Sequence, residues 1–417
     1  MSATIKDNNK KRSWSEVNKS KKAERKKWKE VNLEKKMKKE LTGAEINQNL
    51  IANQEHITAL KRFSSISIAV PGSIIENAQS PELKTYLAGQ IARAACIFQV
   101  DEIVVFDDYA DEVTAKKAKF NDNVGEQVAR QSCVQLGRIL QYLECPQYLR
   151  KSFFPIHNDL KYCGILNPLN APHHLGTKDE FIFREGVVLN TPVKVGKGSI
   201  VNVGLLQPVQ IDKTLVPGIR CTVKLLPRDT NSKKLKGVVV SPLLPRSETG
   251  IYWGYAVRIA KSLSKVFSQC PYKEGYDLTI GTSDKGSSVD EFDCPKYKHL
   301  LIMFGGLQGL ESALENDNVL DADDPKLLFD YYLNTLPEQG SKTIRTEEAI
   351  LVSLSALRSK LNPEFEVQKF DETKVYCKDS AVTEDNVDAV DSEINEANNS
   401  RSKEVEIKND MSRFDSD

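Results

Sequence analysis

Residues 328–357 read LFDYYLNTLPEQGSKTIRTEEAILVSLSAL, and this stretch decides the fold because it joins a strand pattern to a helix pattern through a polar loop. Residues 328–333 are aromatic and apolar, as in a buried strand. Residues 334–346 are too polar for a strand. Thr346 precedes two acidic residues and an apolar run at helical spacing, which predicts a helix with Thr346 as its N-cap. Loops of this kind bind ligands in open α/β sheets, although an ordinary strand-to-helix connection has the same pattern.

The composition bounds the class of protein. The 417 residues suffice for two or three domains, and 40% hydrophobic content is normal for a soluble globular chain. No run of 18 apolar residues and no apolar leader occurs, so we expect no membrane span and no secretory signal. The eight cysteines contain no CxxC pair and the five histidines show no metal-ligand spacing. We therefore expect reduced thiols, no metal and a nuclear or cytosolic protein.

The zero net charge conceals two oppositely charged ends. Residues 1–40 hold 15 Lys or Arg against 6 acids, and residues 371–417 hold 14 acids against 6 bases. The basic segment has few apolar residues, so we interpret it as an arm that binds RNA phosphates or acts as a nuclear address, through the pairs Lys26-Lys27 and Lys35-Lys36. A solvated tail is the alternative. The acidic segment from 362 is predicted to be disordered.

A strand-helix-strand unit follows the arm. Residues 65–70 (SISIAV) form a β-rich run. Ser80 and Pro81 then provide an N-cap and a first helical residue, and residues 102–107 (EIVVFD) form a buried strand that ends in acids. The apolar face of the helix is predicted to consist of Leu83, Leu87, Ile91, Ala94, Ala95 and Phe98. This unit predicts a parallel α/β sheet, and a further helix is expected over 126–143.

Residues 172–245 change character. Short β-rich runs at 186–189, 200–203, 209–211, 220–225 and 236–240 alternate with Gly, Pro and Asn turns. They predict a small barrel or sandwich inserted in the α/β domain, and a five-stranded barrel of the OB type fits the count. Its basic residues, Lys224 and Arg228 among them, suit contact with a nucleic-acid backbone. His173 and His174 are interpreted as surface or hinge residues.

The α/β pattern then resumes, with a helix expected over 252–269 and strands over 276–281 and 298–304. Small polar loops follow at 281–287 and 305–309, in addition to the loop at 334–346. If the three strands are parallel neighbours, these loops form one pocket at one edge. The glycines do not match the dinucleotide fingerprint and no Walker A motif occurs. The pocket therefore suits an adenosine-like ligand better than a polyphosphate.

Several stretches are similar to the SPOUT superfamily of RNA methyltransferases, the α/β-knot class, in its eukaryotic and archaeal branch with an inserted OB-like domain. The longest are AVPGSIIENAQSPELKTYLAGQIARAACIFQVDEIVVFDD (69–108), LGRILQYLECPQYLRKSFFP (136–155), YDLTIGTS (276–283), FGGLQGLE (304–311) and QGSKTIRTEEAI (339–350). The resemblance covers residues 63–361 and implies a knotted domain over 63–171 and 246–361 with an insert over 172–245. It leaves out the basic arm over 1–62 and the acidic tail over 362–417, which the charge distribution predicts.

The resemblance also implies a trefoil knot, S-adenosylmethionine bound within it, and a homodimer or a heterodimer with a paralogue. The residues that match its cofactor site are Thr282, Gly305, Gly306, Gly309, Asn334, Gln339, Gly340, Ile344 and Thr346. Leu307, Arg345 and Thr346 depart from the ribose-methylating group, which favours methylation of a base, with uridine N3 in large-subunit ribosomal RNA as the first choice. A catalytically silent RNA-binding assembly factor is the alternative, and a nucleolar location is expected for either.

Methylation of a ring nitrogen requires loss of its proton. A guanidinium can stabilise the resulting anion, and a carboxylate can take the proton. Arg93 and Arg345 are the candidates for the first task. Glu348 is the first candidate for the second task, and Glu347 is the second. Arg93 could instead contact phosphate, and Glu348 could serve only the helix dipole.

Overall fold

A computed structural model describes residues 63–109, 129–193, 197–227, 235–320 and 322–366. Contacts divide these residues into two compact units. The first contains residues 63–137 and 241–366, and the second contains residues 138–240. Each unit is described by itself.

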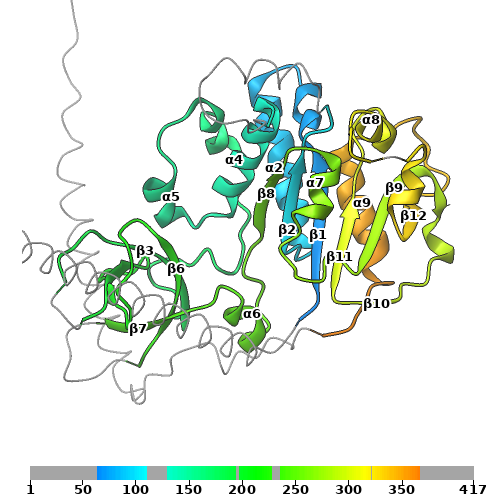
Figure 1. Ribbon diagram of the computed structural model, residues 1–417. Coiled ribbons are helices and arrows are strands. Elements are labelled where there is room, and N and C mark those ends of the chain that lie inside the picture. Colours follow the sequence, from blue (N-terminus) through cyan, green and yellow to red (C-terminus); the bar gives the residue numbers. More distant parts are fainter. Residues whose placement is uncertain (1–62, 110–128, 194–196, 228–234, 321, 367–417) are drawn as a thin grey trace, which may run out of the picture. The chain divides into compact units, whose positions relative to one another are not determined.

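The first unit is built on a six-stranded sheet in the order β12-β9-β11-β1-β2-β8, and every neighbouring pair is parallel (Figure 1). The predicted parallel α/β sheet is confirmed. The strands are β1 Ser65–Pro71, β2 Glu102–Phe106, β8 Ala256–Ala260, β9 Leu278–Ser288, β11 His299–Met303 and β12 Tyr331–Asn334. Because the strands are parallel, the segments that follow β9, β11 and β12 leave the sheet at the same edge.

Helix α2 (Pro81–Ile97) connects β1 to β2 as predicted. Its N-cap is Ser80, whose side chain accepts a hydrogen bond from the Leu83 N–H at 3.3 Å. Two residues assigned to its buried face lie elsewhere: Leu83 is 53% exposed and Phe98 is only half-buried. Leu83 lies at the margin of the face that packs on the sheet, and Phe98 is the C-cap residue that follows the helix.

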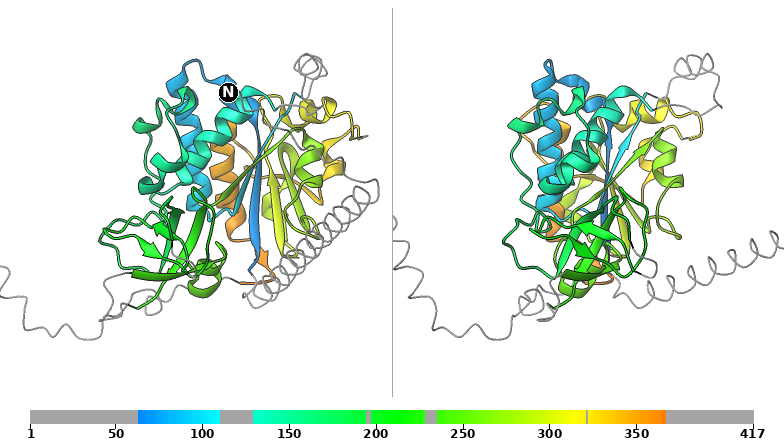
Figure 2. Two further views of the ribbon diagram at one scale, coloured as in Figure 1. Left: turned by 60° about the vertical axis from the view of Figure 1, so that its left-hand side comes forward. Right: turned by 90° about the vertical axis from the view of Figure 1, so that its left-hand side faces the viewer.

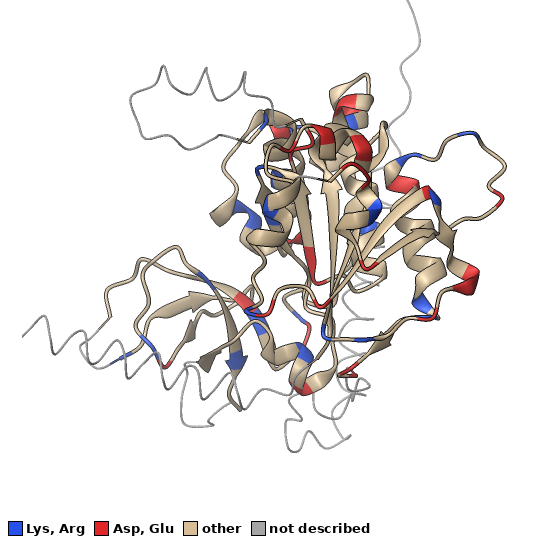
Figure 3. Ribbon diagram, turned by 45° about the vertical axis from the view of Figure 1, so that its right-hand side comes forward, with Lys and Arg blue, Asp and Glu red and all other residues tan. Residues whose placement is uncertain are grey.

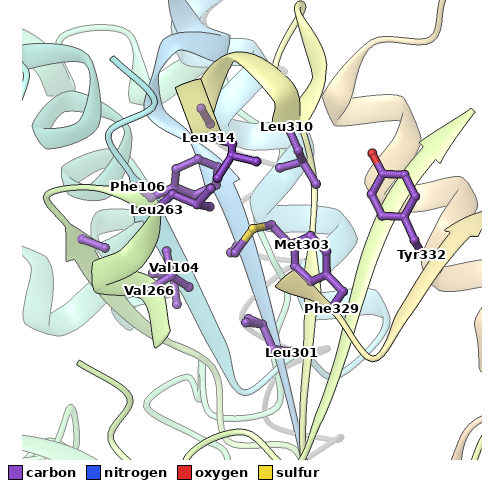
Figure 4. Packing of buried hydrophobic residues seen from close by; sticks show 13 residues of the cluster. Val104, Phe106, Leu263, Val266, Leu301, Met303, Leu310, Leu314, Phe329 and Tyr332 are labelled. Atoms are coloured by element: carbon purple, nitrogen blue, oxygen red, sulfur yellow. The ribbon is translucent and has the colours of Figure 1, made fainter. Parts of the chain in front are cut away.

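Helices cover both faces of the sheet. Figure 2 shows α2 and α9 (Thr346–Arg358) together on one face and α7 (Leu263–Ser268) and α8 (Gly309–Glu315) on the other. The strands accordingly bury both faces. Val104 and Met303 point into the cluster beneath α7 and α8 (Figure 4), whereas their chain neighbours Ile103 and Ile302 are buried on the opposite face. Burial of each such side chain contributes about 1.5–3 kcal/mol.

The predicted helix over 252–269 is wrong. Residues 256–260 form β8, and only 263–268 are helical. The chain is held extended because β8 pairs with β2, and the Ala256 N–H donates to Asp101 O at 2.8 Å. Neighbouring-strand pairing overrides local helical spacing here. The predicted helix over 126–143 is α4 (Gln131–Glu144), and residues 126–128 lie outside the described residues.

Two strand boundaries also differ from prediction. The strand predicted at 328–333 is β12 (Tyr331–Asn334), preceded by the 3₁₀ helix η5 (Pro325–Leu328). Asp330 fixes this boundary, because its carboxylate accepts the Thr279 N–H and hydroxyl, each at 2.8 Å. The strand predicted to end at 281 continues as β9 to Ser288.

The predicted disorder from residue 362 is wrong for residues 362–366. Strand β13 (Asn362–Pro363) pairs with β10 (Lys296–Tyr297). The Glu364 N–H donates to Tyr297 O at 2.8 Å, and the Phe365 N–H donates to Ser64 Oγ at 3.1 Å. The rest of the predicted acidic tail and the basic arm over 1–62 lie outside the described residues.

The second unit contains a closed five-stranded barrel in the order β3-β4-β5-β7-β6. The predicted number of strands is confirmed. Its strands are β3 Phe183–Val188, β4 Ile200–Asn202, β5 Val209–Gln210, β6 Arg220–Leu225 and β7 Leu235–Val240. Five pairs close the barrel, and only β5 with β7 is parallel. The remaining short elements of the described chain are η1 Gly72–Asn77, α5 Gln147–Phe153, η2 Asn158–Leu160, η3 Cys163–Ile165, α6 Leu244–Thr249 and η4 Val289–Glu291.

A buried ionic network lies in this second unit. Arg220 donates to Glu144 at 2.7 and 2.9 Å and to Glu185 at 2.8 Å. His173 is fully buried, with Nε2 3.0 Å from a Glu144 carboxylate oxygen. The surface or hinge interpretation of His173 is therefore wrong, because a buried carboxylate supplies the partner that a buried imidazole needs.

In the described segments, no helix is long and apolar enough to span a bilayer. The same segments contain no group of three or more His, Cys, Asp or Glu side chains arranged to hold a metal ion.

Candidate functional site

The three glycine-containing or polar segments singled out in the sequence meet at the carboxyl edge of β9, β11 and β12. The Thr282 hydroxyl, which follows the last β9 residue paired with β11, donates to Met303 O at the end of β11, at 2.9 Å. The Asn334 amide at the end of β12 donates to Asp284 O at 3.1 Å. Hydrogen bonds therefore join all three strand ends, as predicted from parallel neighbours.

The segment 281–287 is an excursion within β9 rather than the predicted free loop. Gly281 pairs with Tyr332 and Ser287 pairs with Leu333, so residues 282–286 bulge out from the ladder. Gly286 lies at the base of this bulge. A Cβ there would stand 2.6 Å from the backbone nitrogen of Asn334, so only glycine allows the two backbones to approach this closely.

The loop after β11 folds back on itself. The Gly309 N–H donates to Gly306 O at 3.1 Å, and Gly309 has φ +77°, a conformation that glycine adopts without strain. A Cβ on Gly305 would lie 2.8 Å from the carbonyl carbon of Gly309. Gly305, Gly306 and Gly309 are half-buried, which leaves backbone N–H and C=O groups of this loop near the surface.

Helix α9 is tied to that loop. The Thr346 hydroxyl donates to Gly305 O at 2.9 Å, and Thr346 is 9% exposed. The prediction of Thr346 as N-cap is wrong by one residue: Arg345 precedes the helix, and Thr346 is its first residue. Glu348 accepts the Arg345 N–H at 3.2 Å, so this carboxylate caps its own helix. Its proposed role as a base remains a prediction.

Ser73 and Asp108 complete the edge, and neither was singled out in the sequence as a site residue. The Ser73 hydroxyl donates to Asp108 Oδ2, and the Ser73 N–H donates to Oδ1 at 3.3 Å. A Cβ on Gly306 would lie 3.4 Å from Ser73 Oγ and 3.5 Å from Asp108 Oδ2. The acidic end of the predicted strand at 102–107 was the sequence signal that could have identified Asp108 as a site residue. Figure 3 shows acidic ribbon around this end of the sheet.

Other predicted residues lie apart from this cluster of contacts. Arg93 is the thirteenth residue of α2, about 18 Å along the axis from Pro81. Since α2 runs from the carboxyl edge to the amino edge, Arg93 lies toward the opposite edge from the glycine loop. Arg345 is exposed at the start of α9.

The loop that leads to α9 is more open than the glycine loop. Gln339 donates to Ser341 O at 3.1 Å, and a Cβ on Gly340 would meet no atom within 4 Å. Ile344 is half-buried. These three predicted cofactor residues therefore lie on the same loop. The hydrogen bond from Gln339 stays within the loop and does not join it to the ends of the strands.

Most of the residues predicted to contact RNA are not among the described residues. Lys26, Lys27, Lys35, Lys36 and Arg228 lie outside the described residues. Lys224 is half-buried on β6, and its Nζ lies 5.3 Å from the ring centroid of Phe183.

The geometry defines the chemistry that the edge supports. Half-buried glycines present main-chain donors and acceptors, which match the ring edge and hydroxyls of a nucleoside. Lys285, the basic residue of the β9 excursion, is paired with Glu311 at 2.7 Å. The residues present therefore fit an adenosyl group better than a polyphosphate. The fold and this edge are those of an α/β protein with a site for a nucleoside-containing ligand at its strand ends.

Comparison with known proteins specifies the family. Residues 65–357 match the family model described as "Putative RNA methyltransferase". The 28S rRNA (uridine-N(3))-methyltransferase of Drosophila melanogaster is 51% identical over 88% of this chain and 76% of its own length. The proteins of the same name from Mus musculus and Homo sapiens are 57% and 55% identical over 70% of this chain and 76% and 78% of their lengths. The chain belongs to this RNA methyltransferase family.

A solved structure offers only a distant likeness. The SpoU methyltransferase AviRb from Streptomyces viridochromogenes, in complex with AdoMet, is 12% identical with a TM-score of 0.27, and covers 72% of this chain and 58% of that chain.

Proposed function

We propose that this protein transfers a methyl group from S-adenosylmethionine to N3 of a uridine in large-subunit ribosomal RNA. The observation that carries the proposal is the set of hydrogen bonds joining the ends of β9, β11 and β12 at the carboxyl edge. The chain combines this edge with more than 50% identity to enzymes named for that reaction.

The cofactor is held, in this proposal, by the segments that carry Thr282, Gly305 and Asn334. When bound, it supplies a methyl group on a positively charged sulfur, which is already activated for transfer. The protein must therefore align the acceptor with the methyl group and exclude water. The hydrogen bond between Thr346 and Gly305 fixes the loop before α9 against the glycine loop, and this contact supports the knotted arrangement that the family resemblance implies.

The active form is proposed to be a homodimer that meets through α2 and α9. Leu83, Tyr86 and Ile97 are 53%, 48% and 53% exposed and share one face of α2 with Arg93, at successive spacings of three, seven and four residues. Leu351 on α9, which packs on α2, is 45% exposed. A second copy of the chain suits this stripe because it would cover the exposed apolar residues. It would also bring Arg93 of one chain to the glycine loop of the other chain.

The barrel is proposed to be of the OB type and to contact RNA. Its closed order of five strands, with one parallel pair that joins the third strand to the fifth, supports the assignment. The basic arm is proposed to direct the protein to the nucleolus and to add phosphate contacts during ribosome assembly.

Purified protein incubated with methyl-labelled cofactor and fragments of large-subunit rRNA tests the proposal. Nucleoside analysis should recover 3-methyluridine from one fragment. Calorimetric titration of the cofactor distinguishes the methyltransferase from a silent assembly factor. The silent factor would show neither cofactor binding nor incorporation of the methyl label. Incorporation into ribose or into guanine would overturn the uridine assignment alone.

A further inference from the structure

The pair formed by Ser73 and Asp108 is the buried polar feature that borders the glycine loop. Ser73 follows β1 and Asp108 follows β2, so two neighbouring parallel strands deliver them to the carboxyl edge. Asp108 is 8% exposed, and both of its carboxylate oxygens accept hydrogen bonds from Ser73. Its backbone carbonyl accepts from the Asn316 side chain at 3.0 Å, which fixes the main chain at this point.

The neighbouring acid has a different task. The carboxylate of Asp107 accepts the backbone N–H of Arg130 at 3.1 Å and that of Tyr109 at 3.2 Å, and it lies 3.7 Å from the Arg130 guanidinium. Asp107 therefore holds the chain after β2. Within the described residues, the carboxylate of Asp108 accepts hydrogen bonds from Ser73 and from its own backbone N–H, and it lies beside Gly306.

The electrostatics of Asp108 suit proton transfer. Burial raises the pKa of this carboxyl above its ordinary value, and the charge of Asp107 adds to the rise, while the hydrogen bonds from Ser73 oppose it. A carboxylate with a raised pKa holds a captured proton more firmly than one in water does. Glu348, in contrast, is exposed and occupied by the N–H of Arg345.

We infer that Asp108 is the base that takes the N3 proton of the acceptor uracil, and that Ser73 is the residue that positions it. The inference depends on the proposed function and adds a residue to that site. The N3–H bond breaks and the proton passes to Asp108 oxygen. The electron pair left on N3 forms the bond to the methyl carbon, and the pair of the breaking carbon–sulfur bond stays on sulfur.

The position of Gly306 supports this assignment. A Cβ at residue 306 would make ordinary van der Waals contact with Ser73 Oγ and Asp108 Oδ2. The glycine therefore leaves the face of the pair that borders the proposed cofactor loop uncovered by a side chain. A Gly306→Ala variant is expected to fold and yet to place a methyl group over the pair.

The test uses the full chain with Asp108→Asn, Ser73→Ala and Gly306→Ala, and with Asp323→Asn at an exposed carboxyl as the matched control. Asp108→Asn should lower kcat by about 100-fold, with the dissociation constant of S-adenosylmethionine within twofold of the unchanged protein. Fluorine at uracil C5 acidifies N3–H, so RNA with 5-fluorouridine should shrink the defect about tenfold. Asp323→Asn should change nothing.

Equilibrium binding provides a readout without turnover. In the absence of the methyl donor, the unchanged protein should prefer an RNA fragment with the target uridine over the same fragment with 3-methyluridine, because only uridine donates N3–H to Asp108. Asp108→Asn should reduce that preference. A melting curve shows whether Asp108→Asn is folded. If that variant is unfolded, Ser73→Ala and Gly306→Ala must each lower kcat for the inference to stand.

Two failures are distinguishable. If the unchanged protein leaves uridine N3 unmethylated, the proposed function falls and this inference falls with it. If the unchanged protein is active while folded Asp108→Asn retains kcat within threefold and keeps its preference for uridine, only the inference is overturned.

Discussion

The hydroxyl of Thr346 donates a hydrogen bond to the carbonyl oxygen of Gly305 across 2.9 Å, although the two residues are 41 positions apart in the chain. This bond joins the first residue of α9 to the glycine loop after β11. It lets the start of a helix and a backbone loop act as one rigid wall, and the wall is where the cofactor is proposed to bind.

Replacing Thr346 with Val should weaken that wall. The change keeps the shape of the side chain and removes the donor, which leaves the half-buried Gly305 carbonyl without this partner and costs about 1–3 kcal/mol. We expect the dissociation constant of S-adenosylmethionine to rise about tenfold by calorimetry, since about 1.4 kcal/mol corresponds to that factor. Thr346→Ser retains the hydroxyl and should bind within about threefold of the unchanged protein. Equal affinity of Thr346→Val would show that the bond does not shape the site.

The base of the β9 excursion should tolerate no side chain. A Cβ at Gly286 would meet the backbone of Leu333 and Asn334, so the strand ends must separate to admit it. Gly286→Ala should lower the free energy of unfolding by about 1–3 kcal/mol, measured in urea. Gly164→Ala is the matched control, because a Cβ at Gly164 meets no atom within 4 Å. An unfolding midpoint for Gly286→Ala equal to that of the control would contradict the close approach.

The buried network in the second unit predicts sensitivity to acid. Burial favours a higher pKa for Glu144, but hydrogen bonds from His173 and Arg220 outweigh it and lower the pKa to about 2, against 4.5 in the unfolded chain. The folded pKa is depressed, so the contribution to stability is present above pH 4.5 and is lost as the pH falls toward 2. Burial and the neighbouring His173 lower the pKa of His174 to about 4 from 6.5, so protonation of His174 also favours unfolding, between pH 6.5 and 4.

Glu144→Gln tests this contribution. The shift in the pKa of Glu144 corresponds to about 3 kcal/mol, so the variant should unfold more easily by about that amount at pH 7 and show a flatter dependence between pH 4.5 and 2. Thermal unfolding followed by circular dichroism measures both. Glu180→Gln, at an exposed position of the same unit, should leave the profile unchanged. A Glu144→Gln profile as steep as that of the unchanged protein would argue against the network as the cause.

Local sequence signals located the sheet better than they located the site. Ser80 and Pro81 predicted the start of α2 because capping is a local interaction, and short β-rich apolar runs predicted β1 and β2. The helix predicted over 252–269 failed because pairing with β2 decides that segment, and pairing partners are far apart in sequence. The same limit hid Asp108, which reaches Gly306 only through the order of strands in the sheet.

The proposed dimer predicts that a charge on the exposed stripe of α2 separates the subunits. Leu83→Glu together with Tyr86→Glu should convert a dimer to a monomer in analytical ultracentrifugation, because two carboxylates would have to be buried against the partner's apolar side chains. Ile156→Glu, at a fully exposed position outside α2 and α9, should remain dimeric. A monomeric unchanged protein would rule out the dimer.

Mixing two inactive variants tests whether Arg93 acts across the dimer. Arg93→Ala keeps an intact glycine loop, whereas Gly305→Ala places a Cβ 2.8 Å from the Gly309 backbone and should disable that loop. In a mixed dimer, the loop of the first chain meets the arginine of the second, so one of the two sites is intact. Random exchange should restore about a quarter of the activity. If Arg93 instead serves the site of its own chain, every site keeps one defect and mixing restores none, because subunit exchange cannot repair a site built from a single chain.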